Sequence, residues 1–174
     1  MLVDLIDFYN HIILPKGNIP ESVSSNKSVF GVNGVVLVEQ PILPNKNCLI
    51  QSNNGFFDNI VCDGQAINTD LCMVKKLTIV GFSELGTVKE NIIITHEDEE
   101  YRYEFVMKTF HTNYNYSVEN TLNKKCKRIS VALGSDGQNH NIFSYDIDLK
   151  TPIKIKRLLL PVNLSVHILF IEYS

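Results

Sequence analysis

Residues 101–106 read YRYEFV, an alternation of aromatic or aliphatic side chains with charged ones. Successive side chains of a β-strand point to opposite faces of the sheet, so the aromatic positions share one face while Arg102 and Glu104 share the other. Residues 153–156, IKIK, repeat this alternation. One apolar and one polar face is typical of a strand that packs on a core on one side and meets water on the other. Both stretches therefore predict antiparallel β-structure.

Short β-branched or aromatic runs continue from Val29 onward, separated by clusters of Asn, Gly, Asp and Pro. They are VFGVNGVVLVEQ (29–40), NCLIQS (47–52), NIVCDGQAI (59–67), KKLTIVGFSE (75–84), VKENIIITHE (88–97), EYRYEFVMKTF (100–110), CKRISVALG (126–134), NIFSYDIDL (141–149), IKIKRLLLP (153–161) and SVHILFIEY (165–173). No helical segment lies between these runs, which argues against a parallel α/β sheet. Their rhythm fits a sandwich or a barrel, and of these we predict an all-β fold that is an antiparallel jelly-roll β-sandwich.

The first 14 residues have a different pattern. Apolar side chains recur there at helical spacing, at Leu2, Leu5, Ile6, Tyr9, Ile12 and Ile13. This spacing predicts a short amphipathic N-terminal helix that ends before Pro15. The polar stretch 16–28 reads as a loop that wraps a sheet edge. We therefore expect two parts, an N-terminal helix and wrapping loop over 1–28 and a single β-sandwich domain over 29–174.

Composition and charge exclude several classes of function. The chain has 44% apolar and 20% charged residues, as expected of a packed globule. Its 16 Lys and Arg against 19 Asp and Glu give a net charge of −3, without the basic excess of a nucleic-acid binder. No apolar stretch reaches the roughly 18 residues of a membrane span, and the first residues lack the features of a secretory signal. We expect a cytoplasmic protein with no nucleic-acid or membrane partner and with reduced, mostly buried cysteines.

The residues that carry chemistry do not form a known catalytic or metal motif. The five histidines show no HxH, HxxxH or HExxH spacing, and no GxSxG elbow occurs. We therefore expect no enzyme activity, no cofactor and no metal, with His167 as a histidine of the core or of a sheet edge. Asp58, Asp63 and Asp70 leave a structural Ca²⁺ ion as an open alternative, since carboxylates that flank turns are common without any metal.

Two polar loops are the best candidates for a binding site. The first, HTNYNY (111–116), combines aromatic and amide side chains, and the second, GSDGQNH (134–140), combines carboxylate, amide and imidazole groups. Sugars need an aromatic face for their C–H groups and polar partners for their hydroxyls. If both loops lie at one end of the sandwich, they form one site. The predicted ligand-binding residues are His111, Asn113, Tyr114, Tyr116, Asp136, Gln138, His140 and Asn54. The alternative is that the rings cover the sandwich end and the polar residues only form turns.

Three segments resemble the galactose-binding-domain-like β-sandwich modules found beside glycoside hydrolase domains, including the group related to the NPCBM modules. They are FFDNIVCDGQAI (56–67), KLTIVGFSELGTVKENIIITHED (76–98) and NIFSYDIDLKTPIKIKRLLLPVNLSVHILFIEYS (141–174). The chain departs from that family at HEDEE (96–100), where a D-G-(Ser/Thr) turn is usual, and at TFHT (109–112), where a D-W pair is frequent. It also has no tryptophan, the commonest sugar-stacking side chain.

This resemblance implies a non-catalytic carbohydrate-binding-like module that recognises a sugar through end-loop aromatic and amide groups. The alternative is an intracellular structural or protein-interaction β-sandwich without sugar binding. In that case we expect the N-terminal helix to contact a partner protein or a second copy of the chain.

Overall fold

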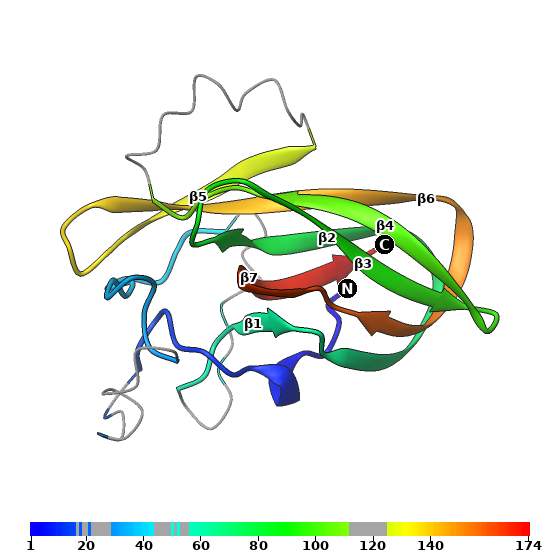
Figure 1. Cartoon of the computed structure of the whole chain (residues 1–174), viewed down its shortest axis with the longest axis horizontal. Helices are drawn as coiled ribbons and strands as arrows, with labels where there is room; N and C mark the ends of the chain where they lie inside the picture. Colours follow the sequence, from blue (N-terminus) through cyan, green and yellow to red (C-terminus); the bar gives the residue numbers. More distant parts are fainter. Residues whose placement is uncertain are drawn as a thin grey trace.

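The computed structural model describes residues 1–16, 18, 21, 29–43, 50, 52, 56–111 and 125–174. Within these ranges the strands are β1 (Ile60–Asp63), β2 (Ala66–Ser83), β3 (Val88–His96), β4 (Glu99–Met107), β5 (Cys126–Leu133), β6 (Asn139–Leu159) and β7 (Val162–Tyr173). They form one sheet in the order β1-β7-β2-β6-β3-β4, and β5 pairs with β6 (Figure 1). Every pairing between these strands is antiparallel, so the predicted all-β, antiparallel class is confirmed.

The two longest strands bend this sheet into two layers. The first part of β2 pairs with the last part of β6, and the last part of β2 pairs with the first part of β6. Between Asn68 and Lys76 the register shifts three times, and such irregularities bend strands and increase their twist. One layer contains β1, β7 and β5, and the other contains β3 and β4 (Figure 1). The arrangement is sandwich-like although the sheet is continuous.

The main core lies between the two layers. Ile92 of β3 and Phe105 of β4 belong to the same buried cluster as Ile79 of β2 and Ile168 of β7. A second cluster lies on the other face of the sheet, where residues of the N-terminal segment cover β2 and β7. Its members include Ile13, Val32, Leu37, Val80, Phe82 and Phe110. The last part of β2 is therefore buried on both faces.

The predicted N-terminal helix is wrong. The segment contains only a short 3-10 turn, Ile6–Phe8. The backbone N–H of Val3 instead donates to the Ile171 carbonyl over 2.9 Å, and Met1 and Tyr173 exchange two hydrogen bonds. The far end of β7 extends beyond β1, so its open edge offers partners that a short helix, marginal by itself, cannot match. No helix in the described ranges is long and apolar enough to cross a membrane.

The run VFGVNGVVLVEQ, which the sequence pattern groups with the strands, forms only isolated bridges. Val32 and Val35 bond to each other across a tight turn, and Leu37 bridges to Gly134. Asn33 and Gly34 at this turn have φ values of 52° and 82°, the left-handed region that Asn and Gly tolerate best. Two other predicted runs, NIFSYDIDL and IKIKRLLLP, are joined in the single strand β6.

A short segment after β4 forms a rung between the ends of β2 and β6. The Phe110 N–H donates to the Ser83 carbonyl over 2.8 Å, and the Asn141 N–H donates to the Phe110 carbonyl over 2.7 Å. The Ser83 N–H in turn donates to the Lys108 carbonyl over 2.9 Å. This rung carries Phe110 and His111 alongside the start of β6.

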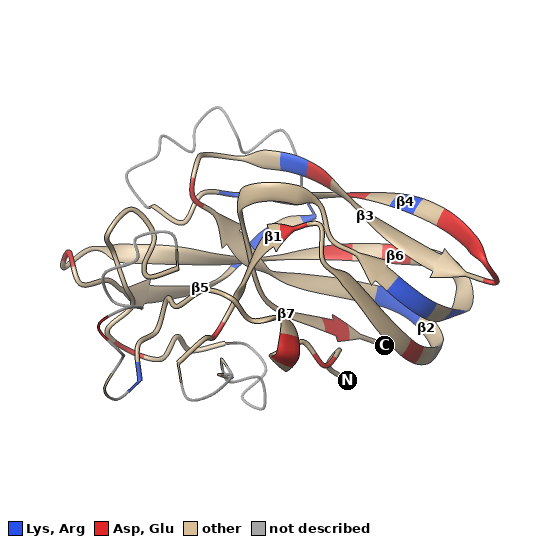
Figure 2. Ribbon diagram, turned by 60° about the horizontal axis from the view of Figure 1, so that its bottom comes forward, with Lys and Arg blue, Asp and Glu red and all other residues tan. Residues whose placement is uncertain are grey.

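Charges of both signs follow β3, β4 and the adjoining parts of β2 and β6 (Figure 2). Several of them pair across strands, with N–O distances of 2.6 Å for Lys89 and Glu104 and 2.9 Å for Lys156 and Asp98. Exposed ion pairs of this kind contribute little to stability.

Candidate functional site

Six aromatic rings follow one another at the end of the sheet where β2 finishes and β6 begins. The centroid distances along this ring row are 4.6 Å for His11–His167, 4.7 Å for His167–Phe82, 4.6 Å for Phe82–Phe110, 4.4 Å for Phe110–His140 and 5.2 Å for His140–His111. A pair of histidines lies at each end. We call His11 and His167 the inner pair, and His111 and His140 the loop pair.

The loop pair contains a buried histidine with a carboxylate partner. The His140 ring stacks on Phe110 at an interplanar angle of 11°, and its Nε2–H donates to Asp136 Oδ1 over 2.9 Å. The hydrogen bond from His140 lowers the pKa of the Asp136 carboxyl group. Gly134 leaves room for this contact, because a Cβ there would lie 2.6 Å from His140 Cδ2 and 2.7 Å from Asp136 Oδ1. His140 and Asp136 are therefore held in one relative geometry.

The second histidine of the loop pair is partly exposed. His111 forms an antiparallel bridge with His140, and its Nε2 lies 3.3 Å from Asn33 Nδ2. Burial, followed by the nearby His140, lowers the pKa of His111, which favours the neutral imidazole. With the Asn33 amide nitrogen as donor, Nε2 of His111 is the acceptor.

The structure brings together three of the residues predicted from the sequence, His111, Asp136 and His140. Gln138 lies exposed in the same turn as Asp136 and donates its backbone N–H to Asp136 Oδ1 over 3.0 Å. The other predicted site residues, Asn113, Tyr114, Tyr116 and Asn54, lie outside the described residues. Sequence reasoning missed Asn33 and Phe110, although the Asn-Gly dipeptide at 33–34 marks a tight turn.

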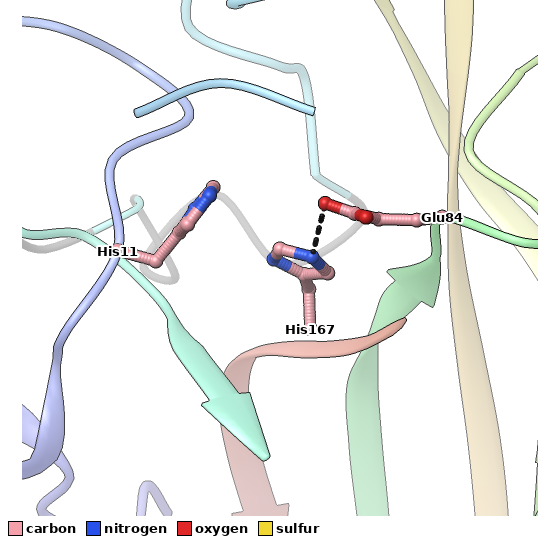
Figure 3. A group of neighbouring side chains, drawn as sticks. All are labelled: His11, Glu84 and His167. Atoms are coloured by element: carbon pink, nitrogen blue, oxygen red, sulfur yellow. Dashed lines mark hydrogen bonds and ion pairs between the residues drawn. The ribbon is translucent and has the colours of Figure 1, made fainter. Parts of the chain in front are cut away.

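The inner pair has a carboxylate of its own. Figure 3 shows His11, Glu84 and His167 approaching one another from three separate segments. His167 Nε2 lies 3.1 Å from Glu84 Oε1. Both imidazoles are buried, whereas the Glu84 side chain is 24% exposed. The sequence-based prediction of a buried histidine at 167 is confirmed, but its contact with a carboxylate was not expected.

Asn59 determines which of the inner histidines carries a proton on Nδ1. Its Nδ2 donates to Asp58 Oδ1 over 2.8 Å, which sets the orientation of the amide. The same Nδ2 lies 3.2 Å from His11 Nδ1, and the Asn59 Oδ1 lies 3.0 Å from His167 Nδ1. His11 Nδ1 is therefore an acceptor, whereas His167 Nδ1 carries a proton and donates it. The remaining proton of His11 is on Nε2, 3.2 Å from the Gly31 carbonyl oxygen.

Asp58 connects this network to the N-terminal segment. Its carboxylate accepts the backbone N–H groups of Ile13 and Leu14 over 2.9 and 2.7 Å. Burial raises the pKa of Asp58 to about 6, although these hydrogen bonds oppose the shift. Burial, followed by the nearby His167, lowers the pKa of His11 to about 3. Both groups therefore titrate far from their usual pH.

Two of the three aspartates considered as Ca²⁺ ligands, Asp58 and Asp70, have other partners. Both oxygens of Asp58 accept hydrogen bonds, and Asp70 pairs with Lys154 at 2.6 Å. Asp63 is exposed. Neither Asp63 nor Asp70 belongs to the group of possible metal ligands found among the described residues. That group is His11, Glu84 and His167.

Two concave surfaces of the described residues could hold a ligand, one beside the inner pair and one at the β3–β4 hairpin. A pocket of about 440 Å³ beside the inner pair is lined by residues that include Asn10, His11, Val61, Asp63, Glu84 and Leu164. A groove of about 500 Å³ lies away from the ring row, between the β3–β4 hairpin and β6, and its lining includes His96, Tyr101, Arg102, Tyr103 and Asp148. Tyr101 there is 39% exposed, so it is a second place where an aromatic face meets solvent.

The opposed pKa shifts of His11 and Asp58 predict an unusual pH dependence of stability. His11, with its lowered pKa, contributes stability that is lost as pH falls from 6.5 towards 3. Asp58, with its raised pKa, contributes stability that is present below 3.8 and lost as pH rises through 6. The two contributions cancel between about pH 4 and 6.

We therefore expect the Asp58→Asn variant to expose the His11 contribution. Relative to wild type, its free energy of unfolding falls by roughly 1 kcal/mol per pH unit as pH drops from 6 to 4. Urea unfolding followed by circular dichroism across this range measures the difference. Parallel pH profiles for the two proteins would show that the shifts are not those described.

No protein-family model matches the chain, and no curated protein matches its sequence. The resemblance to NPCBM-related modules therefore remains a prediction. A functional assignment has to rest on the geometry of the chain's own residues.

Proposed function

We propose that the protein is a non-catalytic carbohydrate-binding-like module of the jelly-roll, galactose-binding-like type, with its site at the loop pair. The observation that carries this proposal is the convergence of His111, Asp136 and His140 from two separate segments. A site that recognises hydroxyl groups needs donors and acceptors held in fixed positions, because unpaired polar groups are costly once a ligand excludes water. Here the stack on Phe110 and the hydrogen bond to Asp136 hold His140 in place.

The polar groups of the loop pair suit a sugar in their chemistry. The Asp136 side chain is 29% exposed and accepts hydrogen bonds from hydroxyl donors. In the neutral imidazole of His111, Nε2 accepts from Asn33 and the N–H of the other ring nitrogen is a donor, which suits the oxygen of a sugar hydroxyl. Gln138 adds an exposed amide in the same turn. In this proposal the aromatic face comes from Tyr114 and Tyr116, which lie outside the described residues.

A glycan-array screen tests this proposal. We expect wild type to bind at least one glycan, and a His111→Ala, Asp136→Ala double variant to bind it about thirtyfold more weakly, since each of two lost hydrogen bonds costs about 1 kcal/mol. Both side chains are at least partly exposed, so the double variant should fold. His96→Ala, which removes an imidazole from the distant groove, is the matched control and should bind as wild type does.

The other outcomes of the screen point to different conclusions. Unchanged binding by the double variant would contradict a site at the loop pair. Binding lost in Tyr101→Ala instead would move the site to the groove beside β3 and β4. No binding by wild type to any glycan would favour the alternative, a structural or protein-interaction module.

One observation favours that alternative. Val38, Val131 and Leu133 are 53%, 42% and 36% exposed, and the Val38 N–H donates to the Leu133 carbonyl, so the three lie together along β5. Exposed apolar side chains that gather in one place are typical of protein contacts. The N-terminal helix that we expected to make such a contact is absent, because that segment has only a 3-10 turn and pairs with β7, so a contact through the segment stays a prediction.

A further inference from the structure

The contact between His167 and Glu84 needs a cation. His167 Nδ1 carries a proton, because it donates to Asn59 Oδ1. When the ring is neutral, Nε2 directs its lone pair at Glu84 Oε1, which is 3.1 Å away and is also an acceptor. Two acceptors at this distance repel each other unless a proton or a metal ion lies between them.

A third ligand atom lies in the same place. His11 offers a ring nitrogen that lies, with those of His167 and Glu84, in a group whose atoms are all within 4.8 Å of one another. In the tautomer set by Asn59, Nδ1 of His11 is the nitrogen with the lone pair. Asn59 Nδ2 also donates to Asp58, so it keeps a partner when the His11 lone pair turns to a metal ion. A single proton joins only two atoms, whereas a metal ion uses all three.

From this geometry we propose that His11, His167 and Glu84 bind one divalent transition-metal ion, with Zn²⁺ as the reference ion. Two imidazoles and a carboxylate are a ligand set that Zn²⁺ favours, with the fourth position open to water or a ligand. Ligand atoms around a tetrahedral Zn²⁺ ion lie about 3.4 Å apart, so His11 has to approach by no more than about 1.5 Å.

The surroundings of the three ligands resemble the outer shell of a metal site. Histidines that bind metals usually donate their other ring N–H to an amide, a carboxylate or a backbone carbonyl. His167 does so to Asn59, and His11 does so to Gly31. His167 also stacks on Phe82, at an interplanar angle of 15°. The imidazoles are therefore oriented before an ion arrives.

An ion can reach the site from solvent. The pocket of about 440 Å³ has His11 and Glu84 in its lining, and Asn10 and Asp63 contribute polar groups to it. The site is independent of the loop pair and of sugar binding. No sequence pattern indicates it, since its ligands lie at positions 11, 84 and 167 and satisfy no local spacing rule.

Calorimetric titration of the chelator-treated full chain with Zn²⁺ tests the site. We expect one ion per chain, and a Glu84→Gln variant should bind more than about tenfold more weakly. This variant keeps the volume of the side chain, and its amide can donate to His167 Nε2, so its fold should persist. Asp63→Asn, which changes a carboxylate in the same pocket outside the ligand set, is the matched control and should bind as wild type does.

Two further measurements do not rely on the heat of Zn²⁺ binding. At equal concentration, Zn²⁺ should raise the melting temperature of wild type and of Asp63→Asn more than that of Glu84→Gln, because an ion that binds only the folded state stabilises it according to its affinity. Co²⁺ in place of Zn²⁺ should give the visible absorption of a tetrahedral site in the same two proteins. The absence of Zn²⁺ binding by wild type, or equal affinity in Glu84→Gln, would overturn the proposal.

Discussion

Replacing Gly81 with alanine is expected to lower the free energy of unfolding by at least about 4 kcal/mol, the range of the most damaging single substitutions. A Cβ at this position would lie 1.9 Å from the backbone oxygen of His167 and 3.0 Å from its carbonyl carbon. Backbone atoms cannot rotate away, so β2 and β7 would have to separate. The close approach coincides with a bulge, since Val80 faces Phe170 while Gly81 faces Ile168, which leaves Leu169 as the extra residue.

Urea unfolding, or the yield of folded protein if the variant is too unstable, measures this effect. Gly137→Ala is the matched control, because nothing lies within 4 Å of its Cβ position and only its φ of 75° opposes a side chain. That substitution should cost about 1 kcal/mol. Equal losses in the two variants would mean that β2 and β7 do not approach as closely as described.

The Asp58→Ala variant is expected to lose about 3 kcal/mol at pH 7. It leaves the buried N–H groups of Ile13 and Leu14 without their acceptor, and each unsatisfied group costs about 1–3 kcal/mol. Removal of a buried carboxylate, whose pKa burial raises to about 6, offsets part of this loss. The amide of Asn59 also loses the partner that fixes its orientation.

Hydrogen exchange distinguishes this local effect from a general one. In Asp58→Ala the amides of Ile13 and Leu14 should exchange faster than those of β2, since the Asp58 carboxylate is the acceptor of both N–H groups. Asp63→Ala, an exposed carboxylate a few residues away, should change stability by less than about 0.5 kcal/mol. If Asp58→Ala were as stable as this control, Asp58 would not anchor the segment.

Strand patterns in the sequence predicted the class of fold because burial follows the side-chain period. Phe105 is buried, and Arg102 and Glu104 are exposed, as the alternation in YRYEFV requires. Tyr101 is the exception, at 39% exposed, because it lies next to the β3–β4 turn and lines the groove there. The bend that joins the two layers could not be predicted, since it depends on how β2 pairs with β6.

The N-terminal segment shows why local periodicity failed. Leu5, Tyr9 and Ile12 are all buried, as a helix face would require, but so are Val3 and His11, which a helix would place on other faces. The chain is extended because β7 and Asn59 supply its hydrogen-bond partners. Those partners are remote in sequence, and propensity alone carries no information about them.

The two candidate sites also differ in how much of each could be predicted from the sequence. The two polar loops around His111 and His140 were visible as loops, because Asn, Asp and Gly clusters mark turns. The two loops lie side by side because Phe110 is hydrogen-bonded to both Ser83 and Asn141. This arrangement requires that the end of β2 lies beside the start of β6, which no local pattern shows. The inner pair depends on β7 lying beside β2 and on the path of the N-terminal segment, so no local pattern reports it.

The strand order has a consequence for how the chain acquires its structure. β7 comes last of the described strands, yet it lies between β1 and β2, with Ile60 paired to Ile168. Long-range pairings of this kind close large loops before they gain any contact energy, so we expect slow folding. During synthesis the β3–β4 hairpin can close early, whereas β1 and the apolar end of β2 must wait for β7. In that interval their unpaired edges are open to aggregation, and this is the stage at which the chain most needs a chaperone.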